Sequence, residues 1–262
     1  MESERPLLIS VSGGKTSAFM AIFLNEHYPN REKLFVFANT GKEREETLIF
    51  LNKLEVHFKI QIIWIEAVIN PVIGYGTTYK IVNFKTASRT GKPFEEVIKK
   101  YGLPSKLFRH CTRELKEIPI NKYARAILGK KYQTAIGIRA DEQHRLSSRT
   151  NHIYPLVEMN VDIKFINHWW SRQSFDLELN SHEGNCDFCF LKSQRKRMRL
   201  LKDGLNVDWW NNMEKNYGNN KQPMFDVRSD LTIEDLIKMN NEANKQLSFF
   251  DDMSFDCICK SS

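Results

Sequence analysis

The stretch Ile9-Ser10-Val11-Ser12-Gly13-Gly14-Lys15-Thr16-Ser17 decides how the N-terminal part of the chain folds. The apolar run before the glycines, residues 7–11, has the length of a short buried strand. Residues 18–24 are apolar again and long enough for a helix. We therefore predict a strand that breaks at the two glycines and leads directly into a helix.

A loop of this composition suits an anion such as phosphate. Glycine lets the backbone turn sharply and approach a ligand, and the first N–H groups of a helix have no acceptor within it. The Lys15 ammonium and nearby hydroxyls add donors. The candidate phosphate-binding residues are Ser10, Ser12, Gly13, Gly14, Lys15, Thr16 and Ser17. A plain strand-to-helix turn capped by hydroxyls is the alternative interpretation.

Strands and helices alternate through the first half of the chain. Apolar runs predict further strands, at residues 34–38, 60–65 and 133–138, and residues 43–57 read as a helix. This alternation predicts a parallel sheet covered by helices, with ligands at the carboxyl ends of the strands. Two more groups of candidate ligand-binding residues follow predicted strands: Asn39, Thr40 and Gly41, and then Gly137, Arg139, Asp141, Glu142 and Arg145.

The remaining segments are less regular. Residues 70–91 read as a long loop or lid, and residues 153–157 as a brief extended segment. Helices are expected at 94–101, within 113–128 from near Pro119 onward, at 162–170 and from a capping box at Thr232–Asp235. We predict a nucleotide-binding domain at 1–170 and a helical C-terminal region at 171–262.

Composition narrows the class of protein. With 262 residues, 41% of them hydrophobic, the chain can build a sizeable core. The N-terminus lacks a signal-peptide core, and apolar runs fall short of the roughly 20 residues of a membrane helix. We therefore expect a cytoplasmic protein without a membrane partner. The net charge of +7 favours anionic partners, nucleic acid or nucleotides, although a solvated basic surface explains it equally well.

The cysteines suggest thiol or metal chemistry, because an odd number of cysteines, five, cannot all pair in a disulfide framework. Cys186 and Cys189 form a CxxC pair, Cys111 follows His110, and Cys257 and Cys259 lie in the tail. A CxxC pair can hold a metal ion or part of an iron–sulfur cluster, can act as a redox dithiol, or can be incidental.

Five ordered motifs resemble one family. The Ser-Gly-Gly-x-x-Ser loop at residues 12–17 resembles the PP-loop of ATP pyrophosphatases, which cleave ATP between its α and β phosphates. Residues 110–116, 137–142, 154–156 and 184–189 follow in the order of the phosphoadenosine phosphosulfate (PAPS) reductase-like family. Over roughly residues 7–200 the chain is identified as a member of that family, with an α/β parallel-sheet fold of the adenine nucleotide alpha hydrolase-like type. It departs from the family at Thr16, where an aspartate is usual.

The resemblance implies a nucleotide site and a metal site. It assigns ATP with Mg²⁺ to the residues after the strands, and a [4Fe–4S] cluster, or zinc as the alternative, to Cys111, Cys186 and Cys189. The fourth cluster ligand stays open between His110, a tail cysteine and an exogenous group. The predicted catalytic residues are Lys15, Arg139, Asp141, Cys257 and Cys259. A surface ion-pair network is the alternative interpretation of the charged residues after the fourth strand.

The resemblance also implies a reaction. The first expectation is an ATP-dependent, pyrophosphate-releasing enzyme that adenylates an acceptor and transfers sulfur, acting on a nucleotide or nucleic acid with a sulfur donor protein. Lys116 would reach substrate anions, and the basic cluster Arg195, Lys196, Arg197 and Arg199 would contact a nucleic-acid backbone or simply be solvated. The alternatives are a sulfonucleotide reductase using a tail cysteine and a non-catalytic binding module. An oligomer is compatible with each.

Overall fold

The computed structural model describes residues 5–105, 107–218 and 231–242. Its contacts divide the chain into two compact units, which are described separately. The first unit comprises Met1–Tyr101 and Arg109–Asp187, and the second comprises Gly102–Phe108 and Phe188–Ser262. The predicted residues Cys257 and Cys259 lie outside the described residues.

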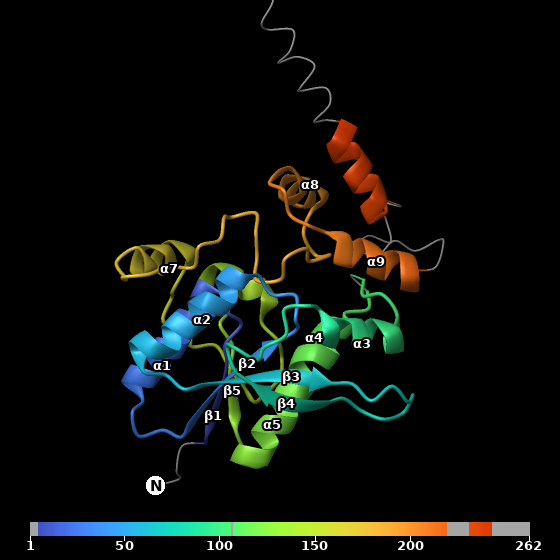
Figure 1. The fold of residues 1–262 in the computed structure, drawn as a ribbon. Coiled ribbons are helices and arrows are strands. Elements are labelled where there is room, and N and C mark those ends of the chain that lie inside the picture. Colours follow the sequence, from blue (N-terminus) through green and yellow to red (C-terminus); the bar gives the residue numbers. More distant parts are fainter. Residues whose placement is uncertain (1–4, 106, 219–230, 243–262) are drawn as a thin grey trace, which may run out of the picture. The chain divides into compact units, whose positions relative to one another are not determined.

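A six-stranded sheet with the order β4-β3-β2-β1-β5-β6 forms the centre of the first unit (Figure 1). The strands are β1 (Leu7–Ser10), β2 (Lys33–Asn39), β3 (Ile62–Val68), β4 (Thr78–Val82), β5 (Gln133–Ala135) and β6 (His152–Ile153). Every neighbouring pair is parallel except β3 and β4. The predicted α/β fold with a parallel sheet is therefore confirmed.

Nine helical segments accompany this sheet in the described part of the first unit. They are α1 (Lys15–His27), α2 (Glu45–Phe58), α3 (Lys92–Tyr101), α4 (His110–Thr112), the π-helical η1 (Arg113–Glu117), α5 (Ile118–Leu128), the 3₁₀-helical η2 (Ala140–Arg145), α6 (Pro155–Glu158) and α7 (Ile163–Trp170). Asp162 caps α7 by accepting a hydrogen bond from the Phe165 N–H, so the predicted helix at 162–170 is confirmed.

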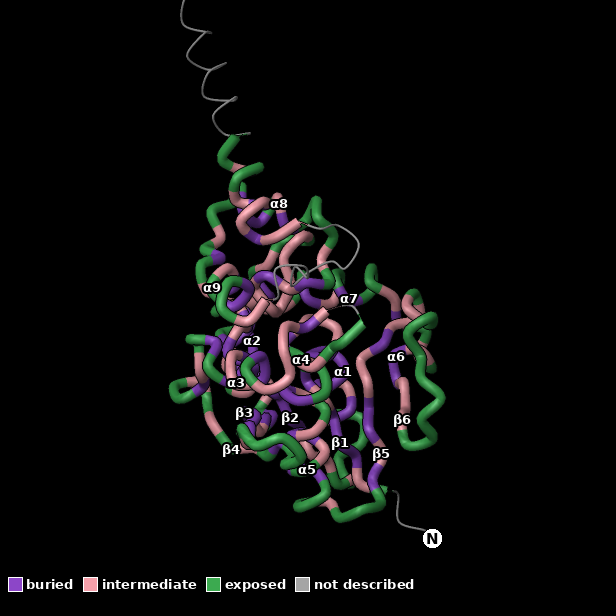
Figure 2. Tube along the Cα trace, turned by 90° about the vertical axis from the view of Figure 1, so that its right-hand side faces the viewer, coloured by how far each residue is buried: buried purple, intermediate pink, exposed green. Residues whose placement is uncertain are grey.

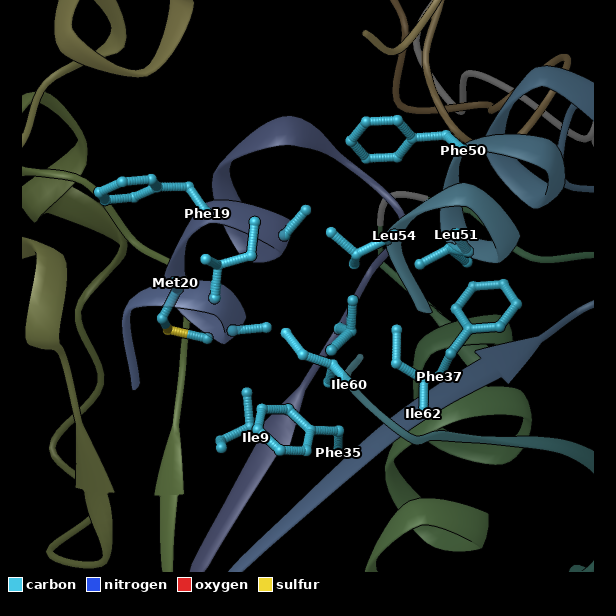
Figure 3. Close-up of a cluster of buried hydrophobic side chains, with 14 of the residues drawn as sticks. Ile9, Phe19, Met20, Phe35, Phe37, Phe50, Leu51, Leu54, Ile60 and Ile62 are labelled. Atoms are coloured by element: carbon cyan, nitrogen blue, oxygen red, sulfur yellow. The ribbon is translucent and has the colours of Figure 1, made fainter. Parts of the chain in front are cut away.

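Alternating side chains of the strands build a core on each face of the sheet. Leu7 and Ile9 point to the face covered by α1 and α2, while Leu8 points to the face covered by α5. Figure 3 shows Phe19 and Met20 of α1 and Leu54 of α2 over Ile9 and the neighbouring strand residues. Because both faces are covered, the central strands are buried nearly throughout (Figure 2) and read as continuous apolar runs.

The prediction of a continuous loop at 70–91 is wrong, because β4 lies within it. This strand pairs antiparallel with β3, with Glu66 opposite Lys80 and Val68 opposite Thr78. Its side chains are exposed or half-buried. An edge strand of this kind lacks the apolar run by which the other strands were predicted.

The helix predicted to begin near Pro119 begins earlier, at His110. Helical backbone runs from α4 through η1 into α5, and the Ile118 N–H bonds to the carbonyl of Arg113, five residues back. Pro119 has no N–H to donate. The wider π-turn just before it accommodates the missing bond, so the helix passes through the proline.

Two predicted extended segments are shorter than expected. The fourth predicted strand, 133–138, is limited to β5, and the extended segment at 153–157 contains the two-residue β6 followed by α6. Pro155 starts α6, because its fixed φ suits the first turn of a helix.

The described part of the second unit is helical. It contains α8 (Gln194–Lys202), α9 (Asp208–Tyr217) and a helix over residues 233–242. The predicted capping box is confirmed, because the Thr232 N–H donates to Asp235 Oδ2 at 2.9 Å and the Asp235 N–H donates to Thr232 Oγ1 at 3.1 Å.

One residue of the predicted basic cluster is not on the surface. Arg195, Lys196 and Arg199 are exposed on α8, whereas Arg197 is 2% exposed. Arg197 lies three and four residues before the buried Leu200 and Leu201, so helical periodicity turns it toward the interior with them.

Across the described ranges, we find no helix that combines the length and the apolar character needed to cross a bilayer.

Candidate functional site

The glycine loop connects β1 to α1 as predicted. Gly13 has a φ of +82°, a conformation that L side chains rarely adopt, and an added Cβ there would lie 2.4 Å from Thr47 Cγ2. Position 13 therefore requires glycine for two independent reasons. Gly14 occupies the N-cap of α1, which leaves the first N–H groups of that helix without intrahelical acceptors.

Two serine hydroxyls hold the loop in shape. Ser17 Oγ lies 2.9 Å from Ser12 Oγ, accepts a hydrogen bond from the Ser12 N–H at 3.0 Å and donates to the Gly14 carbonyl at 3.0 Å. The Asn185 side chain, which lies near the C-terminal end of the first unit in sequence, donates to the Ser12 carbonyl at 2.7 Å. The predicted loop residues thus form one hydrogen-bonded turn at the start of a helix, and Ser10 lies just before it, half-buried at the end of β1.

The segment after β5 packs directly against this loop. An added Cβ at Gly137 would lie 3.2 Å from Ser17 Cα, so the absence of a side chain there permits the close approach. Arg139 Nη1 donates to Thr16 Oγ1 at 3.2 Å. The chain leaves β1 toward β2 on one side and returns to β5 on the other, which makes this the topological switch point of the sheet.

Arg139 is held by two acidic side chains. Its Nε and Nη2 donate to the Asp141 carboxylate at 2.9 and 3.0 Å, and its Nη1 lies 3.3 Å from Glu142 Oε2. The hydrogen bond to Asp141 raises the pKa of Arg139, and the same bond lowers the pKa of Asp141. Asp141, predicted to be catalytic, therefore stands in this structure as the bidentate partner of the arginine.

Lys15 is paired with a residue that sequence reasoning did not single out. Its ammonium lies 2.5 Å from Asp176 Oδ2, and its carbonyl accepts a hydrogen bond from Trp170 Nε1 at 3.0 Å. The Lys15 and Asp176 side chains are 25% and 39% exposed. Solvent and ligands can therefore reach this ion pair.

The turn after β2 lies at the same edge of the sheet and is tightly held. Asn39 is fully buried and donates to Glu66 Oε1 at 2.7 Å, while its own Oδ1 accepts from the Gly41 N–H at 3.2 Å. Thr40 donates to Glu43 Oε2 through both its N–H and its hydroxyl, at 2.8 and 2.7 Å. The predicted residues of this turn are thus brought to the sheet edge, although the buried side chains of Asn39 and Thr40 are committed to the protein.

The segment before the CxxC pair is anchored on the start of α2. Cys186 pairs with Glu43 as an antiparallel bridge, and the Arg44 N–H donates to the Asn185 carbonyl at 2.7 Å. Lys116 of η1 lies 3.7 Å from Glu43 Oε1. Motifs that are distant in the sequence, residues 40–44, 116 and 185–186, are therefore neighbours within the first unit.

The predicted metal ligands are placed as follows. Cys111 in α4 and Cys186 belong to the first unit, and Cys189 belongs to the second; each is half-buried. In the described part of the chain no three His, Cys, Asp or Glu side chains are gathered closely enough to hold a metal ion. His110, a candidate fourth ligand, stacks on Tyr101, and burial lowers its pKa. The metal site stays a prediction.

A comparison with known proteins identifies the family. The profile of the phosphoadenosine phosphosulfate reductase domain matches residues 6–72, which span β1 to the end of β3. The uncharacterised nin region protein ORF290 of Escherichia phage lambda is 33% identical over 201 residues, covering 75% of this chain and 69% of the phage protein. The chain belongs to the PAPS reductase-like family of PP-loop proteins.

A second, more distant relative is an archaeal protein. An uncharacterised protein of Methanocaldococcus jannaschii is 25% identical over 169 residues, which cover 64% of this chain and 30% of the archaeal one. The family acts on nucleotides and binds adenine nucleotides. The PAPS reductase-like domain thus indicates an enzyme that acts on a nucleotide.

Some residues of the site were missed by sequence reasoning. Asn185 lies inside the Gly184–Cys189 motif, so its position in that motif was a signal that could have drawn attention to it. Asp176, Trp170 and Glu66 carry no local signal, because their partners come from distant parts of the chain.

Proposed function

We propose that the chain is a cytoplasmic ATP-dependent enzyme that adenylates an acceptor, releases pyrophosphate and transfers sulfur to the activated position. One observation carries this proposal. Arg139, which follows β5, reaches the glycine loop that follows β1 and contacts Thr16 there. A guanidinium, the Lys15 ammonium and the free end of α1 together form a set of donors for a polyphosphate.

Each loop residue has a part in holding the nucleotide. The α1 N-terminus and the Ser12 and Ser17 hydroxyls receive the β and γ phosphates, Lys15 turns from Asp176 to them, and Arg139 binds oxygens nearer the α phosphate. Asp141 and Glu142 keep Arg139 charged and oriented. Thr16 replaces the usual aspartate of the loop and gives Arg139 a neutral hydroxyl to bond, so the loop places no third carboxylate beside the arginine.

The reaction follows from this placement. An acceptor oxygen attacks the α phosphorus, the bond from that phosphorus to the bridging oxygen breaks, and pyrophosphate leaves with the electron pair. Donors that bind the departing charge lower the barrier of this step. A sulfide ion from a donor then displaces AMP from the acceptor, so that the acceptor oxygen leaves with AMP and sulfur takes its place.

The cysteines enter no step of this scheme. Three thiols are the donor type that iron–sulfur clusters and zinc prefer, but the described side chains do not form a ready metal-binding group. The assignment of Cys111, Cys186 and Cys189 to a cluster is therefore kept as a separate prediction. Iron and sulfide analysis of anaerobically purified protein tests it.

A nucleic acid is the acceptor class that the second unit favours. Exposed cations follow one side of α8, at Arg195, Arg199 and Lys202, with Lys196 beside them. Such a row suits a phosphate backbone. The acceptor nucleotide would supply the oxygen that is replaced by sulfur.

The experiment is incubation of the full chain with ATP, Mg²⁺, sulfide and bulk tRNA or DNA, followed by detection of AMP and pyrophosphate. We expect pyrophosphate release that Ser17→Ala and Lys15→Ala reduce at least about tenfold. Substitution of Lys53, a half-exposed lysine of α2, by alanine should leave it unchanged. Release of sulfite from PAPS or adenosine phosphosulfate without ATP turnover would contradict the proposal and identify a sulfonucleotide reductase. Nucleotide binding without turnover would identify a binding module.

A further inference from the structure

The loop between β3 and β4 presents apolar side chains to solvent. Figure 1 shows it extending away from the ends of the two strands. Its residues 71–76, Pro-Val-Ile-Gly-Tyr-Gly, carry no polar group except the tyrosine hydroxyl. Val72, Ile73 and Tyr75, the apolar tip, are 55%, 86% and 63% exposed. Contiguous exposed apolar side chains of this kind are typical of an interaction surface, unlike ones scattered singly.

The protein holds this loop in a defined conformation. The Lys100 ammonium donates to the carbonyls of Asn70 and Tyr75 at 2.7 and 2.6 Å, and so bridges the two sides of the loop. Just before β4, the fully buried Thr77 donates its hydroxyl to Glu114. Because the loop is tied down without a partner, a partner that binds the apolar tip has little conformational entropy left to remove.

The positive charge of the chain is concentrated in the segment that contains α3 and α5. Residues 92–131 hold eleven of the 39 lysines and arginines but four of the 32 acidic residues, and this excess equals the net charge of the whole chain, +7. Within the first unit, α5 packs on β4 through Tyr123 and Tyr79, whose rings lie 5.3 Å apart. A Cβ added at Gly76 would lie 3.9 Å from Lys122 Nζ, so this lysine of α5 reaches the loop.

The cations of α5 are not neutralised by the protein. Four exposed cations of α5 and the turn after it form no ion pair within the described residues: Lys122, Arg125, Lys130 and Lys131. Three of the four acidic side chains of the segment lie within ion-pair distance of a cation: Glu95, Glu114 and Glu117. Lys122 and Arg125 are neighbours on one side of the helix, since they are three residues apart. This surface therefore complements a polyanion that also carries flat apolar rings.

We propose that the apolar tip and α5 bind an unpaired segment of nucleic acid. Tyr75 stacks on one base and Ile73 contacts the next, while Lys122 and Arg125 neutralise phosphates of the same strand. A duplex keeps its bases stacked on one another, so it offers phosphates here but no free ring faces. The inference rests on nucleic acid as the acceptor class proposed above, and it names the form that this surface takes: a single strand, loop or bulge.

Fluorescence anisotropy of the full chain tests this inference without ATP. The probes are a labelled single strand of about 20 nucleotides, as DNA and as RNA, and the duplex of the same sequence. The single strand should bind at least about fivefold more tightly than the duplex, and Tyr75→Ala should remove that advantage while Tyr75→Phe keeps it. Tyr28→Ala changes another exposed tyrosine, at the C-cap of α1, and should leave both affinities unchanged.

The salt dependence tests the part played by charge. Lys122→Ala and Arg125→Ala should each lower the slope of log affinity against log salt by about one, for single strand and duplex alike. The matched control is Lys164→Ala, because Lys164 is exposed on α7, which packs on the other face of the sheet. Unchanged single-strand affinity in a Tyr75→Ala protein that remains folded by circular dichroism overturns the inference.

Two further measurements separate this inference from other accounts. A dimer in sedimentation that Ile73→Ser dissolves, with no change in oligonucleotide affinity, assigns the apolar tip to a second copy of the chain and overturns the inference. Binding that depends on Tyr75 in a chain that releases no pyrophosphate supports it and contradicts the proposed function. Binding that does not depend on Tyr75 in a chain that turns over ATP overturns this inference alone.

Discussion

The Lys15 ammonium of the glycine loop lies 2.5 Å from Asp176 Oδ2. A carboxylate of the protein is therefore paired with the cation to which we assign pyrophosphate binding. A bound polyphosphate must compete with Asp176 for this ammonium. Because the pair is partly exposed, its contribution is small, on the order of 0.2–1 kcal/mol. The competition should therefore be measurable but modest.

Asp176→Asn removes the competing charge and should tighten ATP binding about two- to fivefold. Glu178→Gln is the matched control, because Glu178 lies two residues further and pairs with the distant Lys53 at 3.8 Å. Calorimetric titration with ATP measures both variants. Equal or weaker binding by Asp176→Asn would show that Asp176 positions Lys15 instead of competing for it.

Gly13→Ala should destabilise the fold by about 2–4 kcal/mol, because it combines a strained φ with overpacking against Thr47. Thr47→Ser removes the clashing Cγ2 and should restore part of the loss in the double variant. Gly74→Ala separates the two effects, since Gly74 has a φ of +91° but open space around it. Denaturant unfolding measures all of them, and no rescue by Thr47→Ser would rule out the clash.

Asn185→Ala removes the 2.7 Å hydrogen bond to the Ser12 carbonyl. The free energy of unfolding should fall by about 0.5–1.5 kcal/mol, and ATP should bind more weakly because the loop is less firmly held. Asn180→Ala, in the same segment but exposed, should change neither quantity. A matching loss in both variants would point to a general effect of the segment.

The Arg139–Asp141 pair should persist at every pH near neutrality. Arg139 lowers the pKa of Asp141 below 3.8, so the pairing contributes to stability above the unfolded-state pKa and is lost as the pH falls through the lowered folded value. Carboxyl NMR of the protein should therefore follow Asp141 titrating below 3.8, with Arg139→Gln shifting it upward. A midpoint above 3.8 in the unsubstituted protein would contradict the ion pair.

Local sequence patterns predicted the strands and the turn whose structure depends on residues that are neighbours in the sequence. The strands β1, β2 and β3 are continuous apolar runs because both faces of the sheet are covered, and the glycine loop follows directly from the two glycines between strand and helix. The edge strand β4 has exposed side chains and no such run. The helix across Pro119 was placed too late, because a π-turn absorbs the missing N–H.

Contacts between distant segments account for the rest. Asp176 reaches Lys15 from 161 positions away, and Asn185 reaches Ser12 from 173 positions away. Neither residue stands at a sequence spacing from which its partner can be predicted. The switch point could be predicted because it depends only on the order of the strands, whereas the side chains that surround it depend on tertiary packing.

Calorimetric titration with pyrophosphate tests the central claim most directly, namely that the loop from Ser12 to Ser17 cradles a nucleotide's pyrophosphate. We predict that pyrophosphate binds in competition with ATP, and that the double variant Ser12→Ala and Ser17→Ala weakens both ligands at least about tenfold while remaining folded. Unchanged pyrophosphate affinity in that folded variant would contradict the account and place the nucleotide elsewhere.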